Sequence, residues 1–174
     1  ALGRGWQVTV LNRRRHGAQD GVRALRGDRT APDGLAALGE GTWDVVVDTW
    51  SAAPRAVHES ARLLRGRAGR YVYVSSRSVY AWPSQPGHDE GAPLVEGAEP
   101  DAGLTDYARD KRGGEIGAVG GFGADDFVRV RAGWILGGER DGGRRAWAPH
   151  REDTPLVGVP QQRHPCLRSR VTRP

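Results

Sequence analysis

A tyrosine and a lysine stand four residues apart in the segment Tyr107-Ala-Arg-Asp-Lys111. On a helix, this spacing puts both side chains on one face, so that the lysine charge acts near the tyrosine oxygen. A nearby cation favours the phenolate, which would let Tyr107 exchange a proton with a substrate hydroxyl or carbonyl near neutral pH. Lys111 is the only lysine in the chain. The alternative is an ordinary amphipathic helix with a packed tyrosine and a solvated lysine.

Hydroxyl side chains follow an apolar stretch about thirty residues earlier. A strand expected at 70–75 runs into Ser75, Ser76 and Ser78. Open α/β sheets bind ligands at the carboxyl ends of their strands, so a serine here could hydrogen-bond a substrate oxygen. The alternative is that these serines cap the next helix, because serine is a favoured N-cap residue.

The elements that would position these residues alternate between strands and helices. Short apolar or β-branched runs predict strands at 7–11, 22–25, 44–48, 70–75 and 127–131. Helical spacing predicts helices at 54–65 and 106–119, with a helix fragment at 1–4. This alternation indicates right-handed crossovers and a parallel sheet. The continuous apolar run at 44–48 is typical of a strand covered on both faces, and residues 81–104 are expected to form a long surface loop.

Glycines weaken the second predicted helix. Five of them lie at Gly113, Gly114, Gly117, Gly120 and Gly121. Each costs about 1 kcal/mol relative to alanine, so we expect a short or frayed helix. We assign the glycine-rich run 117–123 to the helix end and turn, because no strand precedes it.

The strand with two serines, followed by Tyr-x-x-x-Lys, resembles the extended and atypical short-chain dehydrogenases/reductases, the NAD-dependent epimerase/dehydratase family. Further stretches similar to the family lie at 4–13, 25–28, 44–49 and 129–137, with Ala132 where proline is common. The resemblance implies a Rossmann-like doubly wound parallel sheet that lacks the family's first strand and glycine-rich loop. It predicts a partial NAD(P)-binding domain at 1–138, followed by an irregular C-terminal segment at 139–174 that is not an independent domain.

The same resemblance implies roles for individual residues. Tyr107 would be the general acid/base, Lys111 would bind the nicotinamide ribose and lower the pKa of Tyr107, and Ser76 would orient the reacting carbonyl or alcohol. Ser76 is preferred to Ser75 from its spacing to Val79-Tyr80. The residues implied to line the cofactor are Asn12, Arg13, Asp28, Thr49, Ser75, Lys111, Ala132 and Gly133.

The turn Asn12-Arg13-Arg14-Arg15 bears on the choice of cofactor. Arginines at the end of the second family strand would suit the 2′-phosphate of NADP, so NADP is favoured over NAD; the alternative is a basic surface turn. The function expected is that of an NAD(P)-dependent oxidoreductase or epimerase/dehydratase-type domain acting on a carbonyl or alcohol, including a sugar-nucleotide. The alternative is a catalytically silent fragment or nucleotide-binding module of the same fold, so whether this chain is an enzyme stays open.

The composition of the chain argues against several kinds of binding partner. The net charge is +5 and the pI about 10.1, yet arginines are scattered among acidic residues, which argues against a nucleic-acid-binding surface. No twenty-residue apolar run could span a membrane, and the single cysteine, Cys166, cannot form an internal disulfide, so we expect a cytoplasmic protein. The five histidines lack metal-ligand spacing. We expect a small-molecule substrate, leave a homodimer open, and expect a fragment of a longer reading frame because the chain starts at Ala1 and has no methionine.

Overall fold

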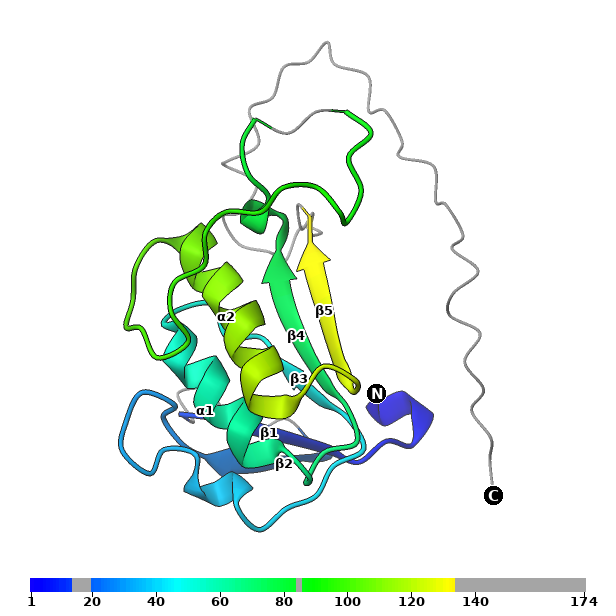
Figure 1. The fold of residues 1–174 in the computed structure, drawn as a ribbon. Helices are drawn as coiled ribbons and strands as arrows, with labels where there is room; N and C mark the ends of the chain where they lie inside the picture. Colours follow the sequence, from blue (N-terminus) through cyan, green and yellow to red (C-terminus); the bar gives the residue numbers. More distant parts are fainter. Residues whose placement is uncertain (14–19, 84–85, 134–174) are drawn as a thin grey trace, which may run out of the picture. The chain divides into compact units, whose positions relative to one another are not determined.

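The chain folds as an α/β protein with parallel strands and two helices (Figure 1). The computed structural model describes residues 1–13, 20–83 and 86–133. Its strands are β1 (Val8–Asn12), β2 (Val22–Arg26), β3 (Val46–Asp48), β4 (Tyr71–Ser76) and β5 (Phe127–Ala132). Its helices are α1 (Pro54–Leu64) and α2 (Tyr107–Phe122), with short 3-10 helices η1 (Leu2–Arg4), η2 (Ala36–Leu38) and η3 (Arg77–Val79). The five predicted strands and both predicted helices are therefore confirmed, and the helix fragment at the start is a 3-10 turn.

The strands form two parallel sheets. β1 pairs with β2, and β3, β4 and β5 form a three-stranded sheet in that order with β4 in the centre. In the second sheet, α1 connects β3 to β4 and α2 connects β4 to β5. Parallel neighbours need such crossover connections, which explains why helix and strand patterns alternate along the sequence.

The core lies between the two helices and the three-stranded sheet. Pro54 suits the first turn of α1 because its missing N–H would have no partner there. Val57, Ala61 and Leu64 follow at helical spacing and are at most 2% exposed. They pack with the fully buried rings of Tyr71 and Tyr73 on β4. Each fully buried large apolar side chain contributes roughly 1.5–3 kcal/mol to folding.

The prediction of a short or frayed second helix is wrong. α2 continues through all five glycines to Phe122. Three of these glycines, Gly113, Gly114 and Gly121, sit where another part of the chain comes too close for a side chain: a Cβ at Gly114 would collide with the Tyr73 hydroxyl, and one at Gly121 would lie 2.8 Å from the His58 carbonyl oxygen in α1. The glycines thus lower the helix propensity of α2 but permit its close packing against α1 and β4.

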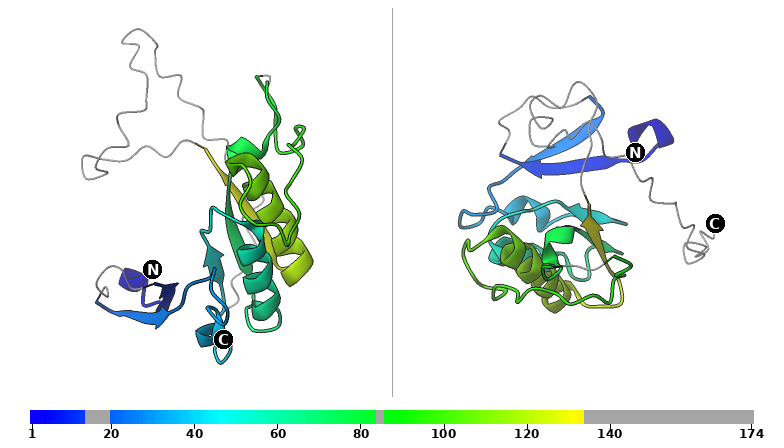
Figure 2. Two further views of the ribbon diagram at one scale, coloured as in Figure 1. Left: turned by 90° about the vertical axis from the view of Figure 1, so that its left-hand side faces the viewer. Right: turned by 90° about the horizontal axis from the view of Figure 1, so that it is seen from above.

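Both helices lie on the same face of the three-stranded sheet (Figure 2). On the opposite face, Val47 in β3 is 60% exposed and Val130 in β5 is 43% exposed. Among the described residues, the predicted covering of β3 on both faces is therefore not found. A doubly wound arrangement remains a prediction.

Several predictions concern residues outside the described ranges. These are the 139–174 segment, Arg14, Arg15, His16, His150, His164, Cys166 and the turn that ends at Gly137. Neither α1 nor α2 combines the length and the apolar composition needed to cross a bilayer. In residues 1–13, 20–83 and 86–133, no three His, Cys, Asp or Glu side chains are grouped to hold a metal ion.

Candidate functional site

The predicted catalytic residues gather at one end of the three-stranded sheet. β4 ends at Ser76, and α2 begins at Tyr107 on the same side of the molecule (Figure 1). Asp106 caps the helix, because its carboxylate accepts hydrogen bonds of 3.1 Å from two backbone N–H groups of the first turn. The 3-10 helix η3, which follows Ser76 directly, packs against α2. β4 therefore ends in a hydroxyl residue that leads directly into a short helix packed against α2.

Ser76 is both the predicted orienting residue and a cap. It is 9% exposed, and its hydroxyl accepts a 3.2 Å hydrogen bond from the backbone N–H of Ser78. The same hydroxyl donates to the Ser78 hydroxyl at 3.2 Å. The capping alternative is thus observed for Ser76, and the two hydroxyls together form a short polar chain that leads away from the end of β4.

Lys111 is buried, contrary to the alternative in which it is solvated. The residue is 3% exposed, and its ammonium donates to the carbonyl oxygens of Trp50 at 2.6 Å and Val74 at 2.7 Å. It also lies 4.9 Å from the ring centroid of Tyr73. Burial lowers the pKa of Lys111, and the carboxylate of Asp48 acts in the opposite direction. Lys111 therefore ties together the segments that follow β3 and end β4.

Tyr107, in contrast to the buried Lys111, is exposed to solvent. Its side chain is 52% exposed at the start of α2, although the amphipathic-helix alternative requires a packed tyrosine. A phenol in this position can reach a bound molecule. Tyr107 and Lys111 thus stand one helical turn apart in α2, the tyrosine half exposed and the lysine buried.

An ion-pair network that the sequence analysis missed continues along α2. Glu115 is fully buried and receives two 2.9 Å hydrogen bonds from the Arg131 guanidinium in β5 and one from Arg112. Burial alone would raise the pKa of Glu115, but the hydrogen bonds from Arg131 hold it below its ordinary value. Glu115 follows Tyr107 and Lys111 at the same four-residue spacing, and that periodicity could have revealed it.

A second buried network lies at the end of β3 and was also missed. Arg29 donates to both carboxylate oxygens of Asp48, at 2.6 and 2.7 Å, and to the hydroxyl of Ser60 in α1 at 2.6 Å. The Tyr71 hydroxyl donates to the same carboxylate. Burial would raise the pKa of Asp48, yet its bonds with Arg29 keep it lowered, and burial raises the pKa of Tyr71. This network joins the segment after β2 to β3, α1 and β4.

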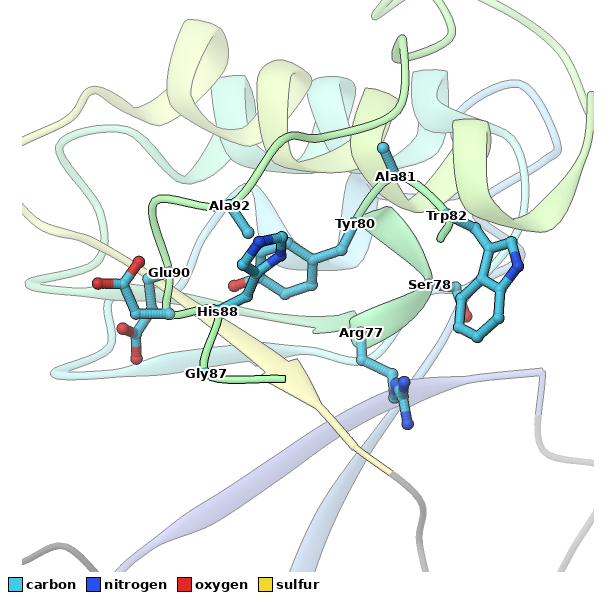
Figure 3. A pocket seen from close by; sticks show the side chains of 10 residues that line it. Arg77, Ser78, Tyr80, Ala81, Trp82, Gly87, His88, Glu90 and Ala92 are labelled. Carbon is cyan, nitrogen blue, oxygen red and sulfur yellow. The ribbon is translucent and has the colours of Figure 1, made fainter. Parts of the chain in front are cut away.

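A cavity of about 570 Å³ opens beside the serine pair (Figure 3). Ser78, which accepts the hydrogen bond from Ser76, forms part of its wall. Aromatic and charged side chains complete the wall: Arg77, Tyr80, Trp82, His88, Asp89 and Glu90. The histidine and the two acidic residues lie in the stretch 81–104 that was predicted to be a long surface loop, and they are exposed and line this cavity.

The predicted cofactor residues fall into two groups. Ser75 and Ser76 pair in register with Arg131 and Ala132 at the ends of β4 and β5, and Gly133 follows directly. Asn12 ends β1, and the next residue, Arg13, lies 3.8 Å from the Asp28 carboxylate after β2. Thr49 follows β3 and is exposed. Within each sheet, the predicted residues are therefore at the carboxyl ends of the strands.

A smaller cavity of about 240 Å³ is lined by β1 and β3. Thr9, Val10 and Leu11 form its β1 side, and residues 46–48 form part of its β3 side. Val10 is 39% exposed and Val47 is 60% exposed. These two strands are therefore open edges that carry exposed β-branched side chains.

Fold and site together define an α/β protein with polar and charged residues at the carboxyl ends of parallel strands. Comparison with known proteins adds no relative: no protein-family model, no curated protein and no solved structure matches the chain. The family resemblance consequently depends on the motifs of the sequence alone.

Proposed function

We propose that this chain carries the proton-transfer part of an NAD(P)-dependent oxidoreductase or epimerase/dehydratase-type site that acts on a carbonyl or alcohol. The observation that carries the proposal is that an exposed Tyr107 and a buried Lys111 stand one turn apart in α2, and that the Lys111 ammonium binds the Val74 carbonyl of β4, the strand that ends at Ser76.

In this site, Tyr107 donates a proton to the substrate oxygen in the reductive direction and accepts it in the oxidative direction. Ser76 orients that oxygen once its single O–H turns from the Ser78 hydroxyl, to which it donates at 3.2 Å, toward the substrate. Lys111 already donates to two carbonyl oxygens, which leaves one of its three N–H groups for a further partner. A nicotinamide cofactor supplies or accepts the hydride when it is bound.

The described residues suit the nicotinamide end and the adenosine end of such a cofactor better than the pyrophosphate between them. Lys111, Ser75 and Gly133 would hold the nicotinamide ribose, and Arg13 would meet the adenosine, where its charge favours NADP. The Asp28 carboxylate beside Arg13 weakens that preference, because it partly neutralises the guanidinium. The open edges of β1 and β3 suit one additional parallel strand between them, which supports the proposal that the family's first strand belongs there.

A catalytically silent nucleotide-binding module of the same fold is the second candidate. It is favoured by the absence, among the described residues, of a glycine turn that joins a strand to a helix N-terminus and could cradle a pyrophosphate. The glycine-rich run at 117–123 lies in α2 and at its end, as the sequence predicted. It therefore cannot form the glycine turn that would cradle a pyrophosphate.

Binding of NADPH and NADH by two proteins tests the proposal. One is this chain, and the other carries an N-terminal extension of one strand, a glycine-rich turn and a helix. We expect the extended protein to bind NADPH more tightly than this chain does, and more tightly than NADH. Failure of the extended protein to bind either nucleotide contradicts the dehydrogenase interpretation.

Catalysis is then tested with Tyr107→Phe in the extended protein. Nicotinamide binding should persist while carbonyl reduction is lost, because the change removes one exposed hydroxyl only. The matched control is Arg109→Met, which alters an exposed side chain in the same turn. Full activity of Tyr107→Phe refutes the proton-transfer role, and inactivity of the unsubstituted extended protein favours the silent module.

A further inference from the structure

The cavity beside Ser78 has a fixed base and one strongly exposed aromatic wall. Tyr80 forms an isolated antiparallel bridge with Leu94, and Ala81 N–H donates to the Pro93 carbonyl at 2.8 Å. These bonds close the segment that carries the cavity's remaining lining residues. Trp82, in contrast, is 82% exposed. An indole that lines a cavity offers a flat apolar surface on which a ring can stack.

The charges that face this cavity disfavour an anionic ligand. Arg77 is its one lining arginine, while Asp89 and Glu90 bring two carboxylates. The lining therefore carries one more carboxylate than guanidinium group. A ligand carboxylate would therefore meet like charges in this cavity, and like charges brought together at a binding surface weaken binding.

A second arginine near the cavity is already neutralised. Arg131 donates to the Tyr80 hydroxyl at 3.1 Å and stacks 4.9 Å from the centroid of its ring. Its charge, however, is satisfied by the doubly hydrogen-bonded carboxylate of Glu115. Arg131 thus holds the Tyr80 wall in place and does not offer a binding group for a phosphate.

We propose, on the basis of the proposed function, that this cavity takes an uncharged ring-containing carbonyl or hydroxyl compound and excludes nucleotide-linked or otherwise anionic substrates. The ring stacks on Trp82, the Ser78 hydroxyl and the His88 ring N–H donate to its oxygens, and the Asp89 and Glu90 carboxylates accept from its hydroxyl groups. The hydrogen bond from Ser76 to Ser78 connects the cavity with the site of proton transfer. A volume of about 570 Å³ is within the range of small-molecule pockets.

Two aldehydes that differ in one charge test the proposal by binding alone, without cofactor or turnover. Methyl 4-formylbenzoate is neutral, 4-formylbenzoate is an anion of the same planar shape, and UDP-glucose represents a nucleotide-linked sugar. Saturation-transfer NMR should give about fivefold weaker binding for the anion than for the ester, and no saturation transfer to UDP-glucose. Tighter binding of either anion than of the ester, or no binding of the ester, overturns the proposal.

Substitutions of the lining residues test which side chains bind the ring and which ones weaken binding of the anion. Trp82→Ala should weaken ester binding roughly 3- to 10-fold, whereas Trp6→Ala, at an exposed tryptophan outside the cavity, should not. Asp89→Asn with Glu90→Gln should bring the anion to the affinity of the ester, and Glu96→Gln, at an exposed position outside the cavity, should leave the difference intact. An ester affinity that is insensitive to Trp82→Ala shows that the ring binds elsewhere and contradicts the proposal.

The outcome is separable from that of the proposed function. If the ester binds as described but Tyr107→Phe leaves carbonyl reduction unchanged, the ligand class stands and the proton-transfer role fails. If Tyr107→Phe abolishes reduction while UDP-glucose binds tightly at the cavity, the proton-transfer role stands and the ligand class fails.

Discussion

The carboxylate of Glu115 in α2 and the guanidinium of Arg131 in β5 form a two-bond ion pair, with both hydrogen bonds at 2.9 Å. Glu115 is fully buried, so its charge depends on this partner and on Arg112. Because Arg131 also holds Tyr80, one ion pair connects the helix of Tyr107, the strand beside it and the wall of the larger cavity. Loss of the pair should therefore affect stability and the cavity together.

Acid should destabilise the protein through this pair. The folded-state pKa of Glu115 lies below its ordinary value of 4.5, so its stabilising contribution is complete above that pH and is lost as the pH falls through the folded pKa. Glu115→Gln should lower the free energy of unfolding by about 3–5 kcal/mol at neutral pH and flatten its decline below about pH 4.5. Urea unfolding of both proteins at a series of pH values measures this. Exposed Glu96→Gln is the control, and an unchanged slope in Glu115→Gln would contradict the assignment.

Two glycines of α2 should respond to alanine in opposite directions. A Cβ at Gly114 meets the Tyr73 hydroxyl, whereas a Cβ at Gly120 has nothing within 4 Å. Gly114→Ala should destabilise the fold by about 1–3 kcal/mol through overpacking. Gly120→Ala should stabilise it by about 1 kcal/mol because alanine has the higher helix propensity. Thermal unfolding of both variants checks the prediction, and equal shifts would show that α2 does not pack as closely as described.

The same glycines show which part of the fold the sequence could not predict, namely the full length of α2. Short apolar or β-branched runs and helical spacing located the five strands and two helices of the described residues, because burial leaves a local signal in the sequence. Glycine propensity is also local, but the benefit of close approach to His58 and Tyr73 comes from residues distant in the chain. The exposed face of Val47 was missed for a related reason, since a continuous apolar run does not reveal which face other elements cover.

The parts of the candidate site that could be predicted are those in which the residues belong to one helix or to the end of one strand. Tyr107 and Lys111 are on one helix and Ser76 ends a strand, so their spacing and context predicted their placement. Arg29 and Asp48 are nineteen residues apart and were not paired in advance. A charge pair across such a distance leaves no periodic signal, and the burial that makes it matter exists only in the folded chain.

Arg29 should stabilise the buried Asp48 carboxylate, and hence the folded protein, more than Tyr71 does. Arg29→Met leaves a buried carboxylate without its main partner and should cost about 3–5 kcal/mol. Tyr71→Phe removes one of several hydrogen bonds to the same carboxylate and should cost about 1 kcal/mol. Denaturant unfolding compares the two variants. A smaller loss in Arg29→Met than in Tyr71→Phe would mean that the guanidinium is not what stabilises Asp48.

Lys111 should prove to be a structural residue as well as a candidate for catalysis. Its ammonium donates to the carbonyls of Trp50 and Val74, and hydrogen bonds to a charged group stabilise by about 1.5–3 kcal/mol each. Lys111→Met keeps the length of the side chain but removes these donors, so the free energy of unfolding should fall by about 2 kcal/mol after the relief of charge burial. Arg109→Met on the exposed side of the same helix should change it by less than about 0.5 kcal/mol. Equal stability of the two variants would show that the Lys111 ammonium does not tie β3 to β4, and any loss of activity in Lys111→Met would then report on catalysis alone.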